Sequence, residues 1–346
     1  MTQNVSVIGA GVIGVSCAWQ LAKSGYTVTV YHHQPLGAGA SGNAAGALKP
    51  FDALQRGWKQ RLQQESLWQY PQFITDIESE SGLNVGFDRC GRVAVYNTQP
   101  SFEKAQKAAA EANKKWPFAP AQSVLTGDDL LRYTPQVEQD AVGGIFCHAT
   151  GAFTPQKLLE ALVKCCKKQG VVFKEQTLDT LPEARPLVMA AGAFTSTLLP
   201  EASIKPIKRQ AVLLEWPIQD PLTHITENGQ VYLVPWDFQC DGGRAVYVGS
   251  TFEPEAGFDN NPTREAEAQL RGDAARLYPE LATAKLLQRF SGLQSRGYGE
   301  GSTLKLGPLA GLEGVYVAAG HGGVGYCMAP VTAAQIVKLI KAQFPA

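Results

Sequence analysis

The sequence predicts an α/β fold in which a Rossmann-like domain is interleaved with an α+β domain built on an antiparallel sheet. Two strand-glycine-helix units, at residues 5–25 and 314–340, indicate parallel strands joined by helical crossovers. Between them, residues 209–216 and 231–252 are rich in β-branched and aromatic residues and are separated by glycine turns, which is typical of antiparallel strands. A chain of 346 residues is long enough for two domains and a sizeable core.

The first strand-glycine-helix unit has the glycine spacing of a dinucleotide-binding turn. Its run V-S-V-I-G-A-G-V-I-G contains Gly9, Gly11 and Gly14. The first glycine permits a tight turn, the second lets the backbone approach a pyrophosphate, and the third lets helix and strand pack closely. Plain turns are the alternative, but the helical pattern over residues 12–23 and the apolar run over residues 26–31 favour a phosphate site at the helix N-terminus.

The acid expected after the second strand is missing. An Asp or Glu normally accepts the ribose hydroxyls there, whereas this chain has Tyr31, His32 and His33. A neutral histidine exchanges one hydrogen bond with a hydroxyl but lacks the charge-assisted pair of a carboxylate. His32 is therefore the predicted, weaker ribose contact.

Composition argues against several function classes. Basic and acidic residues number 31 each, so there is no strong nucleic-acid signal, although a local patch stays open. No apolar run reaches the roughly 18 residues of a membrane span, and the start lacks a signal-peptide pattern, so we expect a cytoplasmic protein with no membrane span. Seven cysteines without a C-x-x-C pair indicate reduced thiols. The five histidines show no ligand spacing, so no metal is expected.

The remaining segments alternate between loop, helical and extended patterns. Residues 37–50 are rich in small residues and are interpreted as a loop along a flat ligand, with a flexible surface linker as the alternative. Helices are predicted over residues 58–81, 102–115, 154–170 and 265–278, the third opened by Thr154 as cap and Pro155 in its first turn. Strands are predicted over residues 85–97 (a pair around Cys90-Gly91), 171–173 (buried) and 187–192, with turns at residues 228–229 and 241–243.

Six motifs follow one another along the chain: GAGVIG, GASGNAAGAL, GAFTP, AAGAF, VYLVP and AAGHGGVGYCMAP. This ordered set resembles the D-amino-acid-oxidase family of FAD enzymes over nearly the whole chain. Within that family it is most similar to glycine oxidases and to the FAD domain of the bifunctional enzyme that makes 5-methylaminomethyl-uridine in tRNA. The expected domains are an FAD-binding domain of residues 1–84, 141–204 and 286–346 and a substrate domain of residues 85–140 and 205–285.

The resemblance also implies which residues bind FAD. The pyrophosphate and the ribose are assigned to Gly9, Gly11, Val12, Ile13, Gly14 and His32. The second motif runs along the pyrophosphate and isoalloxazine through Ser41, Gly42, Asn43, Ala44, Gly46, Ala47 and Leu48. The adenine is assigned to Val172, and the ribityl chain to Ala191 and Gly192. Amides of the last motif face the flavin pyrimidine, where a helix N-terminus favours the negative charge of reduced flavin: Gly320, Gly322, Gly323, Val324, Gly325 and Tyr326.

Substrate binding in amino-acid-oxidising relatives uses an arginine and a tyrosine hydroxyl. Tyr232 lies at the matching place in VYLVP, although a tyrosine packed in the sheet is the alternative. Where relatives have the arginine this chain has Gln294, and Arg296 fills the same space only if the loop is rearranged. Without Arg296 the site lacks a strong carboxylate anchor, because a neutral amide does not replace a charged, planar fork. His321 either shapes its turn or takes part in catalysis.

These residues predict an FAD-dependent amine or amino-acid oxidase or dehydrogenase. Its substrate is a glycine, sarcosine or D-amino-acid type compound, which transfers a hydride from the carbon beside an unprotonated amine to flavin N5, leaving an imine that water hydrolyses. The alternatives are a flavoprotein that modifies a protein- or RNA-borne amine and an FAD-binding partner subunit of a heteromeric dehydrogenase. An NAD enzyme is a further alternative, but nicotinamide binding has no need for the second glycine-helix unit.

Overall fold

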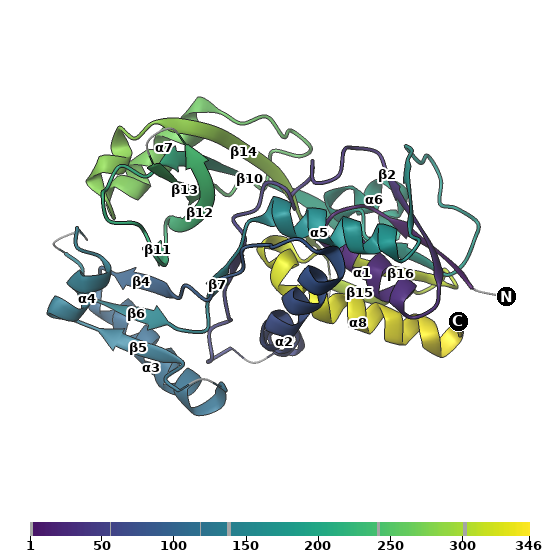
Figure 1. Cartoon of the computed structure of the whole chain (residues 1–346), viewed down its shortest axis with the longest axis horizontal. Helices are drawn as coiled ribbons and strands as arrows, with labels where there is room; N and C mark the ends of the chain where they lie inside the picture. Colours follow the sequence, from purple (N-terminus) through teal and green to yellow (C-terminus); the bar gives the residue numbers. More distant parts are fainter. Residues whose placement is uncertain (1–2, 56, 118, 137–139, 241–242, 300–302) are drawn as a thin grey trace.

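The computed structural model describes residues 3–55, 57–117, 119–136, 140–240, 243–299 and 303–346, and it contains two large sheets (Figure 1). The first sheet, in the order β15-β16-β9-β1-β2-β8, is parallel except for β15, which runs antiparallel to β16. Its strands are β1 (Asn4–Ile8), β2 (Thr27–His32), β8 (Val172–Glu175), β9 (Leu187–Met189), β15 (Lys305–Pro308) and β16 (Val315–Ala319). The Rossmann-like prediction is confirmed.

Helices cover the first sheet, and their apolar faces form the largest core cluster. Helix α1 packs against α8 and α5, and α2 packs against the same two helices (Figure 1). Their bounds are α1 (Val12–Lys23), α2 (Trp58–Ser81), α5 (Pro155–Lys168) and α8 (Gly325–Gln343). Both strand-glycine-helix units therefore belong to one layer, since β16 and β1 both pair with β9.

The second sheet has the order β14-β10-β13-β12-β11-β4-β6-β5 and is antiparallel except where β11 pairs with β4. Its strands are β4 (Arg92–Tyr96), β5 (Gln122–Leu125), β6 (Gly143–Cys147), β10 (Ile204–Glu215), β11 (Ile225–Glu227), β12 (Tyr232–Cys240), β13 (Gly243–Gly249) and β14 (Leu286–Gly297). Helix α7 (Arg264–Ala275) packs on β10 and β13, while α3 (Gln99–Lys115) and α4 (Gly127–Tyr133) lie beside β5 and β6 (Figure 1). The α+β domain on an antiparallel sheet is confirmed.

Smaller elements connect the two sheets. A short ribbon pairs β3 (Ala47–Leu48) with β7 (Gly151–Ala152). The short helix α6 (Thr195–Leu198) follows the 3-10 turn Gly192–Phe194, and further 3-10 turns lie at Pro200–Ala202, Pro279–Ala282 and Gly322–Val324.

The predicted strand pair over residues 85–97 is wrong. Asp88 forms a bridge with Ala152, whereas β4 pairs with β6 and β11. Gly91 separates the two halves at a φ of 75°, and a Cβ there would lie 2.3 Å from the Phe146 ring. The glycine therefore passes the chain from the ribbon of β7 into the second sheet instead of closing a hairpin.

Two smaller predictions, on the burial of residues 171–173 and on the cap of α5, are wrong, and a third falls partly on residues that the structure does not describe. Residues 171–173 were expected to be buried, but β8 is an edge strand and Val172 is 48% exposed. Thr154 precedes α5 without capping it through its side chain. The turn expected at residues 241–243 includes 241 and 242, which lie outside the described residues.

The predicted domain boundaries do not coincide with the two sheets. Strand β6 lies inside the predicted FAD-binding segment 141–204, and β14 inside 286–346, yet both belong to the second sheet. The pairing of β14 with β10 places them there, a relation that the sequence pattern does not show. The exact division into domains stays a prediction.

The segment Gly322–Gln343 is long and apolar enough to cross a membrane by length and composition. In this fold 56% of an 18-residue window of the segment is buried, and α8 packs against α1 and α2. A core helix of a globular domain has the same length and composition, so the segment is weak evidence for a membrane span.

Candidate functional site

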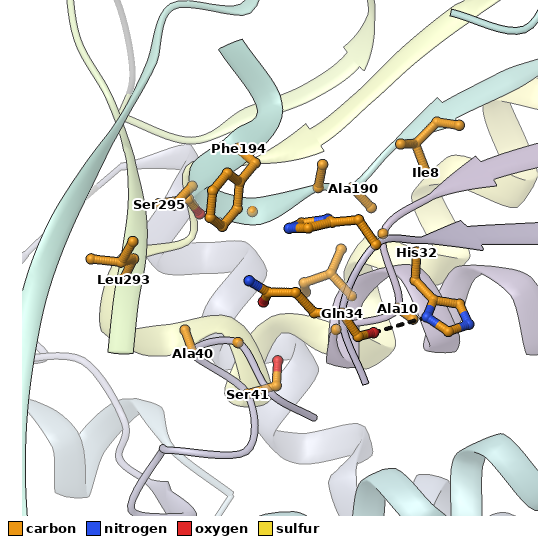
Figure 2. Close-up of a pocket in the computed structure, with 18 of the residues that line it drawn as sticks. Ile8, Ala10, His32, Gln34, Ala40, Ser41, Ala190, Phe194, Leu293 and Ser295 are labelled. Atoms are coloured by element: carbon orange, nitrogen blue, oxygen red, sulfur yellow. Dashed lines mark hydrogen bonds between the residues drawn. The ribbon is translucent and has the colours of Figure 1, made fainter. Parts of the chain in front are cut away.

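A cavity of about 510 Å³ lies beyond the carboxyl ends of the parallel strands (Figure 2). Such strand ends are where open α/β sheets bind ligands, and the volume suits a sizeable organic molecule. The first glycine turn, the segments after β2, β8 and β9, strand β14 and the loop before α8 all contribute to its wall. Of the predicted cofactor residues, the wall contains Gly9, Gly11, Val12, Ile13, His32, Ser41, Ala191, Gly192, Gly322 and Gly325.

The first glycine turn leaves no room for side chains. Gly9 has a φ of 110°, and a Cβ there would lie 2.3 Å from the Ala190 carbonyl oxygen. A Cβ on Gly14 would lie 1.9 Å from the Gly9 carbonyl oxygen, so Gly14 packs helix on strand behind the cavity wall. Gly11 precedes α1, and the Val12 amide donates to Ser41 Oγ at 3.0 Å. The helix N-terminus and the 37–50 loop thus meet at the wall.

Most of the predicted residues of the 37–50 loop shape it without lining the cavity. The Asn43 amide donates to two carbonyls of the same loop, those of Ala38 and Gly39. A Cβ on Gly42 would lie 1.9 Å from the Gly37 oxygen, and one on Gly46 would lie 1.9 Å from the Phe153 oxygen. Ala44 packs at the edge of the core, and β3 holds Ala47 and the fully buried Leu48. Within residues 37–50, Gly37, Gly39, Ala40 and Ser41 line the cavity, and the approach of this loop to a flat ligand stays a prediction.

His32 lies at the cavity, with its ring already engaged by the chain. Its Nδ1 lies 2.9 Å from the Gln34 carbonyl oxygen, so Nδ1 carries the proton and only Nε2 is left for a ligand (Figure 2). Val172 lies at the amino end of β8 and outside the cavity wall, so the adenine contact assigned to it stays a prediction that this position does not favour. Gln176, Thr177 and Leu178 follow the carboxyl end of β8 and line the cavity instead.

The last motif contributes unevenly to the wall. Gly320 has a φ of 83°, and its amide already donates to Ser295 Oγ at 3.1 Å, an arrangement that does not favour the predicted contact of this amide with the flavin. Gly322 and Gly323 begin a 3-10 turn, and first-turn amides have no partner within their helix. Val324 packs against the core rather than in the wall. The Tyr326 hydroxyl donates toward the Ser41 and Pro155 carbonyls at 3.0 and 3.1 Å, which ties α8 to the 37–50 loop.

His321 is a buried, neutral residue of the wall. Burial and, secondarily, the charge of Lys59 lower its pKa to about 3. Its Nε2 lies 3.0 Å from the hydroxyl of Thr332 on α8. The imidazole therefore stays uncharged at neutral pH and holds the turn against the helix.

The second sheet presents an aromatic face to the 37–50 loop. The rings of Trp236 and Tyr247 are stacked with centroids 5.1 Å apart, and Tyr232 stacks on Tyr247 at 6.3 Å. The Tyr247 hydroxyl donates to the Asn43 carbonyl at 2.8 Å. Burial raises the pKa of Tyr232 more than its hydrogen bond with Ser250 lowers it, so the hydroxyl remains protonated. Tyr232, Trp236, Tyr247 and Phe290 together form one aromatic face of the second sheet.

An ion-pair network borders the aromatic face. Glu227 accepts from Lys49 at 2.7 Å and also contacts Arg92. Burial opposes ionisation of Glu227, but the two cations outweigh it and lower its pKa to about 2. Lys49 lies over the Tyr232 ring at 4.8 Å, so the network holds the first residue of β12 in place.

Arg296 lies within β14, and residues 300–302 of the following glycine-rich stretch, whose rearrangement would let Arg296 bind the substrate, lie outside the described residues. Strand β14 continues to Gly297, so Arg296 lies opposite Lys205 of β10 in the strand register. Its side chain is exposed and lies outside the cavity wall. Gln294 lines the cavity, and its Nε2 lies 3.5 Å from the position of a Cβ on Gly323. A neutral amide thus occupies the place expected for an arginine.

Sequence reasoning missed several residues of the site. Gln34 and Gln176 line the cavity, and they lie two residues and one residue beyond the ends of the parallel strands β2 and β8, which is the signal that could have found them. Sequence reasoning also did not show that Arg209 shares a face of the second sheet with Tyr232, which follows from the β10 register. No local motif marks that position.

Comparisons with known proteins agree with this geometry. The profile of the DAO family, described as "FAD dependent oxidoreductase", matches residues 4–339. A glycine oxidase of Geobacillus kaustophilus is 24% identical to this chain, over 98% of this chain and 93% of the relative. A crystal structure of glycine oxidase from the same species superposes with a TM-score of 0.87 at 22% identity, covering 99% of this chain and 95% of that one.

Two bifunctional proteins are also similar. The ThiO/ThiG protein of Nostoc sp. is 28% identical over 99% of this chain, and the chain spans about half the length (53%) of that relative. The tRNA 5-methylaminomethyl-2-thiouridine biosynthesis protein MnmC of Shewanella amazonensis is 31% identical over 49% of this chain and 24% of its own length. Both resemblances predicted from the motifs, to glycine oxidase and to the tRNA enzyme, are confirmed.

Proposed function

Because this chain belongs to the DAO family of FAD-dependent oxidoreductases, we propose that it oxidises the C–N bond of a small amine or amino acid of the glycine, sarcosine or D-amino-acid type. The observation that supports this most is the meeting of two surfaces. A glycine-lined cavity at the strand ends adjoins an aromatic face that carries the Tyr232 hydroxyl. The glycine oxidase of G. kaustophilus supports an amino-acid substrate by its similarity.

The residues of the cavity fit FAD. Positions 9 and 14 exclude any side chain, which leaves backbone amides and the N-terminus of α1 facing the space where a pyrophosphate would lie. Ser41 would border the pyrophosphate, and His32 the adenosine ribose through Nε2. Residues 176–178 would border the adenine, and Gly192 the ribityl chain. Gly322 and Gly323 would present amides to the flavin pyrimidine.

Hydride transfer from an unprotonated amine does not require a protein acid or base. Bound FAD supplies a hydride acceptor at N5. The chain's own task is to hold the substrate C–H toward that atom, to keep the amine unprotonated and to exclude bulk water. His321 is neutral and bonded to Thr332, so it acts as support and not as a base. The amine lone pair forms the C=N bond as the hydride leaves, and water then hydrolyses the imine.

Anaerobic spectroscopy tests this proposal. The purified protein should show flavin absorbance that bleaches on adding glycine, sarcosine or members of a panel of D-amino acids. Boiled protein with the same amines and native protein with N-free acids of the same size serve as controls. A flavin spectrum that no small amine bleaches would contradict the small-substrate proposal and leave an amine borne on protein or RNA, or a missing partner subunit, as the remaining interpretation.

A further inference from the structure

An arginine lies beside the place where the carboxylate anchor is missing. Arg209, on β10, is directly opposite Gly292 on β14, and Gln294 is therefore its diagonal neighbour on the same face. Diagonal neighbours across antiparallel strands are about 7–8 Å apart, a span that a long side chain covers. The Arg209 side chain therefore lies on the face of the sheet that also carries the Gln294 amide.

Arg209 shares this face with the Tyr232 hydroxyl. Ala211 lies opposite Gly249, and Gly249 lies opposite Tyr232, so all three point the same way as Arg209. A Cβ on Gly249 would lie 2.9 Å from the Tyr232 hydroxyl oxygen, so the glycine leaves room for that group. The planar guanidinium of Arg209 and the hydroxyl of Tyr232 are both hydrogen-bond donors, and a carboxylate accepts from groups of these two kinds.

The guanidinium has unused donor capacity. Arg209 Nη1 donates to the Thr251 carbonyl at 2.8 Å, and Arg209 Cζ lies 4.5 Å from the centre of the Phe252 ring. These two contacts orient the guanidinium. Its Nε is buried without a hydrogen-bond partner. In the part of the chain that the structure describes, no carboxylate pairs with Arg209, and Glu227 is already occupied by Lys49 and Arg92.

We propose that Arg209, rather than Arg296, binds the carboxylate of an amino-acid or N-alkyl amino-acid substrate, with the Tyr232 hydroxyl donating a second hydrogen bond. The carboxylate-binding arginine thus lies on β10 instead of on the adjacent strand β14, where Gln294 stands in place of the expected arginine. This assignment rests on the proposed function and narrows its substrate to amines that carry a carboxylate.

Carboxylate binding to the FAD-loaded protein tests the anchor without turnover. Glycolate, which has a carboxylate and no amine, is titrated while the visible flavin spectrum is recorded. Arg209→Gln should raise its Kd about 30-fold or more, because a charge partner is lost. Arg209→Lys should show a smaller loss, since the charge remains without the fork. The matched control Arg289→Gln, on the opposite face of β14, and Arg296→Gln should stay within about twofold.

Three results would overturn the assignment: no spectral response of the wild type to glycolate, unchanged binding in Arg209→Gln, or the loss appearing in Arg296→Gln. Flavin content and Tm of each variant show whether it folds, and Arg209→Lys replaces Arg209→Gln if the latter does not. Sarcosine and dimethylamine are then compared as reductants. If neither reduces the flavin while glycolate binding still depends on Arg209, amine oxidation fails and the anchor stands.

Discussion

The cavity at the strand ends and the aromatic face of the second sheet are built from different parts of the chain. The phosphate end of the cavity is formed by the first glycine turn, where Gly9 in the wall and Gly14 behind it leave no space for a Cβ. The aromatic face is made of side chains from separate strands, such as Tyr232 and Phe290, and is flanked by Arg209. The difference teaches that a site made of main-chain geometry tolerates almost no substitution, whereas a site made of side chains can move its functional group to a neighbouring strand.

The largest effect is expected from Gly9→Ala in the first glycine turn. A methyl group 2.3 Å from the Ala190 oxygen and a φ of 110° each destabilise the fold, by about 1–3 kcal/mol. Thermal unfolding and the flavin absorbance of the purified protein should show a lower Tm and little bound FAD. Gly272→Ala in α7, with nothing within 4 Å of its Cβ, should instead be neutral or stabilising by up to about 1 kcal/mol. A Gly9→Ala protein with full flavin content would refute the steric argument.

A second effect is expected at the border of the aromatic face. Glu227→Gln leaves the buried Arg92 guanidinium without its charge partner, which destabilises the fold by about 3–5 kcal/mol. The exposed Glu313→Gln should change stability by less than about 0.5 kcal/mol. Denaturant unfolding at pH 7 measures both, and equal stabilities would show that the network contributes nothing.

The same ion pair makes stability depend on pH. The folded pKa of Glu227 is lowered from 4.5 to about 2, so its contribution is fully present above about pH 4.5 and is lost as the pH falls toward 2. Unfolding free energies measured between pH 2.5 and 7 should therefore fall less steeply in Glu227→Gln than in the wild type. Parallel curves would contradict the assigned pKa.

The smallest effect is expected at Val172, which is half exposed and outside the cavity wall. Val172→Ala should leave the Kd for FAD, measured with the apoprotein, unchanged within about twofold. Leu178→Ala, in the wall, should weaken FAD binding by roughly tenfold, because covering a leucine contributes about 1.5–3 kcal/mol. A large effect at Val172 and none at Leu178 would support the adenine contact first predicted from the sequence.

Much of the nucleotide half was predictable because its signals are local. The helix over residues 12–23 agrees with α1 to the residue, since the glycine turn before it and Gly25 after it set both ends. The second unit, from β16 to α8, was predictable for the same reason. The assignment of the adenine to Val172 stays a prediction, because the sequence shows that a strand exists, but not which of its ends reaches the ligand.

The sequence by itself determined the family, the cofactor class and the parallel sheet, because glycine turns and strand-helix periods act over a few residues. Tertiary structure decided which side chains share a face of the second sheet. Arg209 and Tyr232 lie on the same face as Gln294 through the registers of β10, β12, β13 and β14, and a register is set by pairing across long separations in the chain. No motif marks Arg209, because only strand pairing brings it to that face.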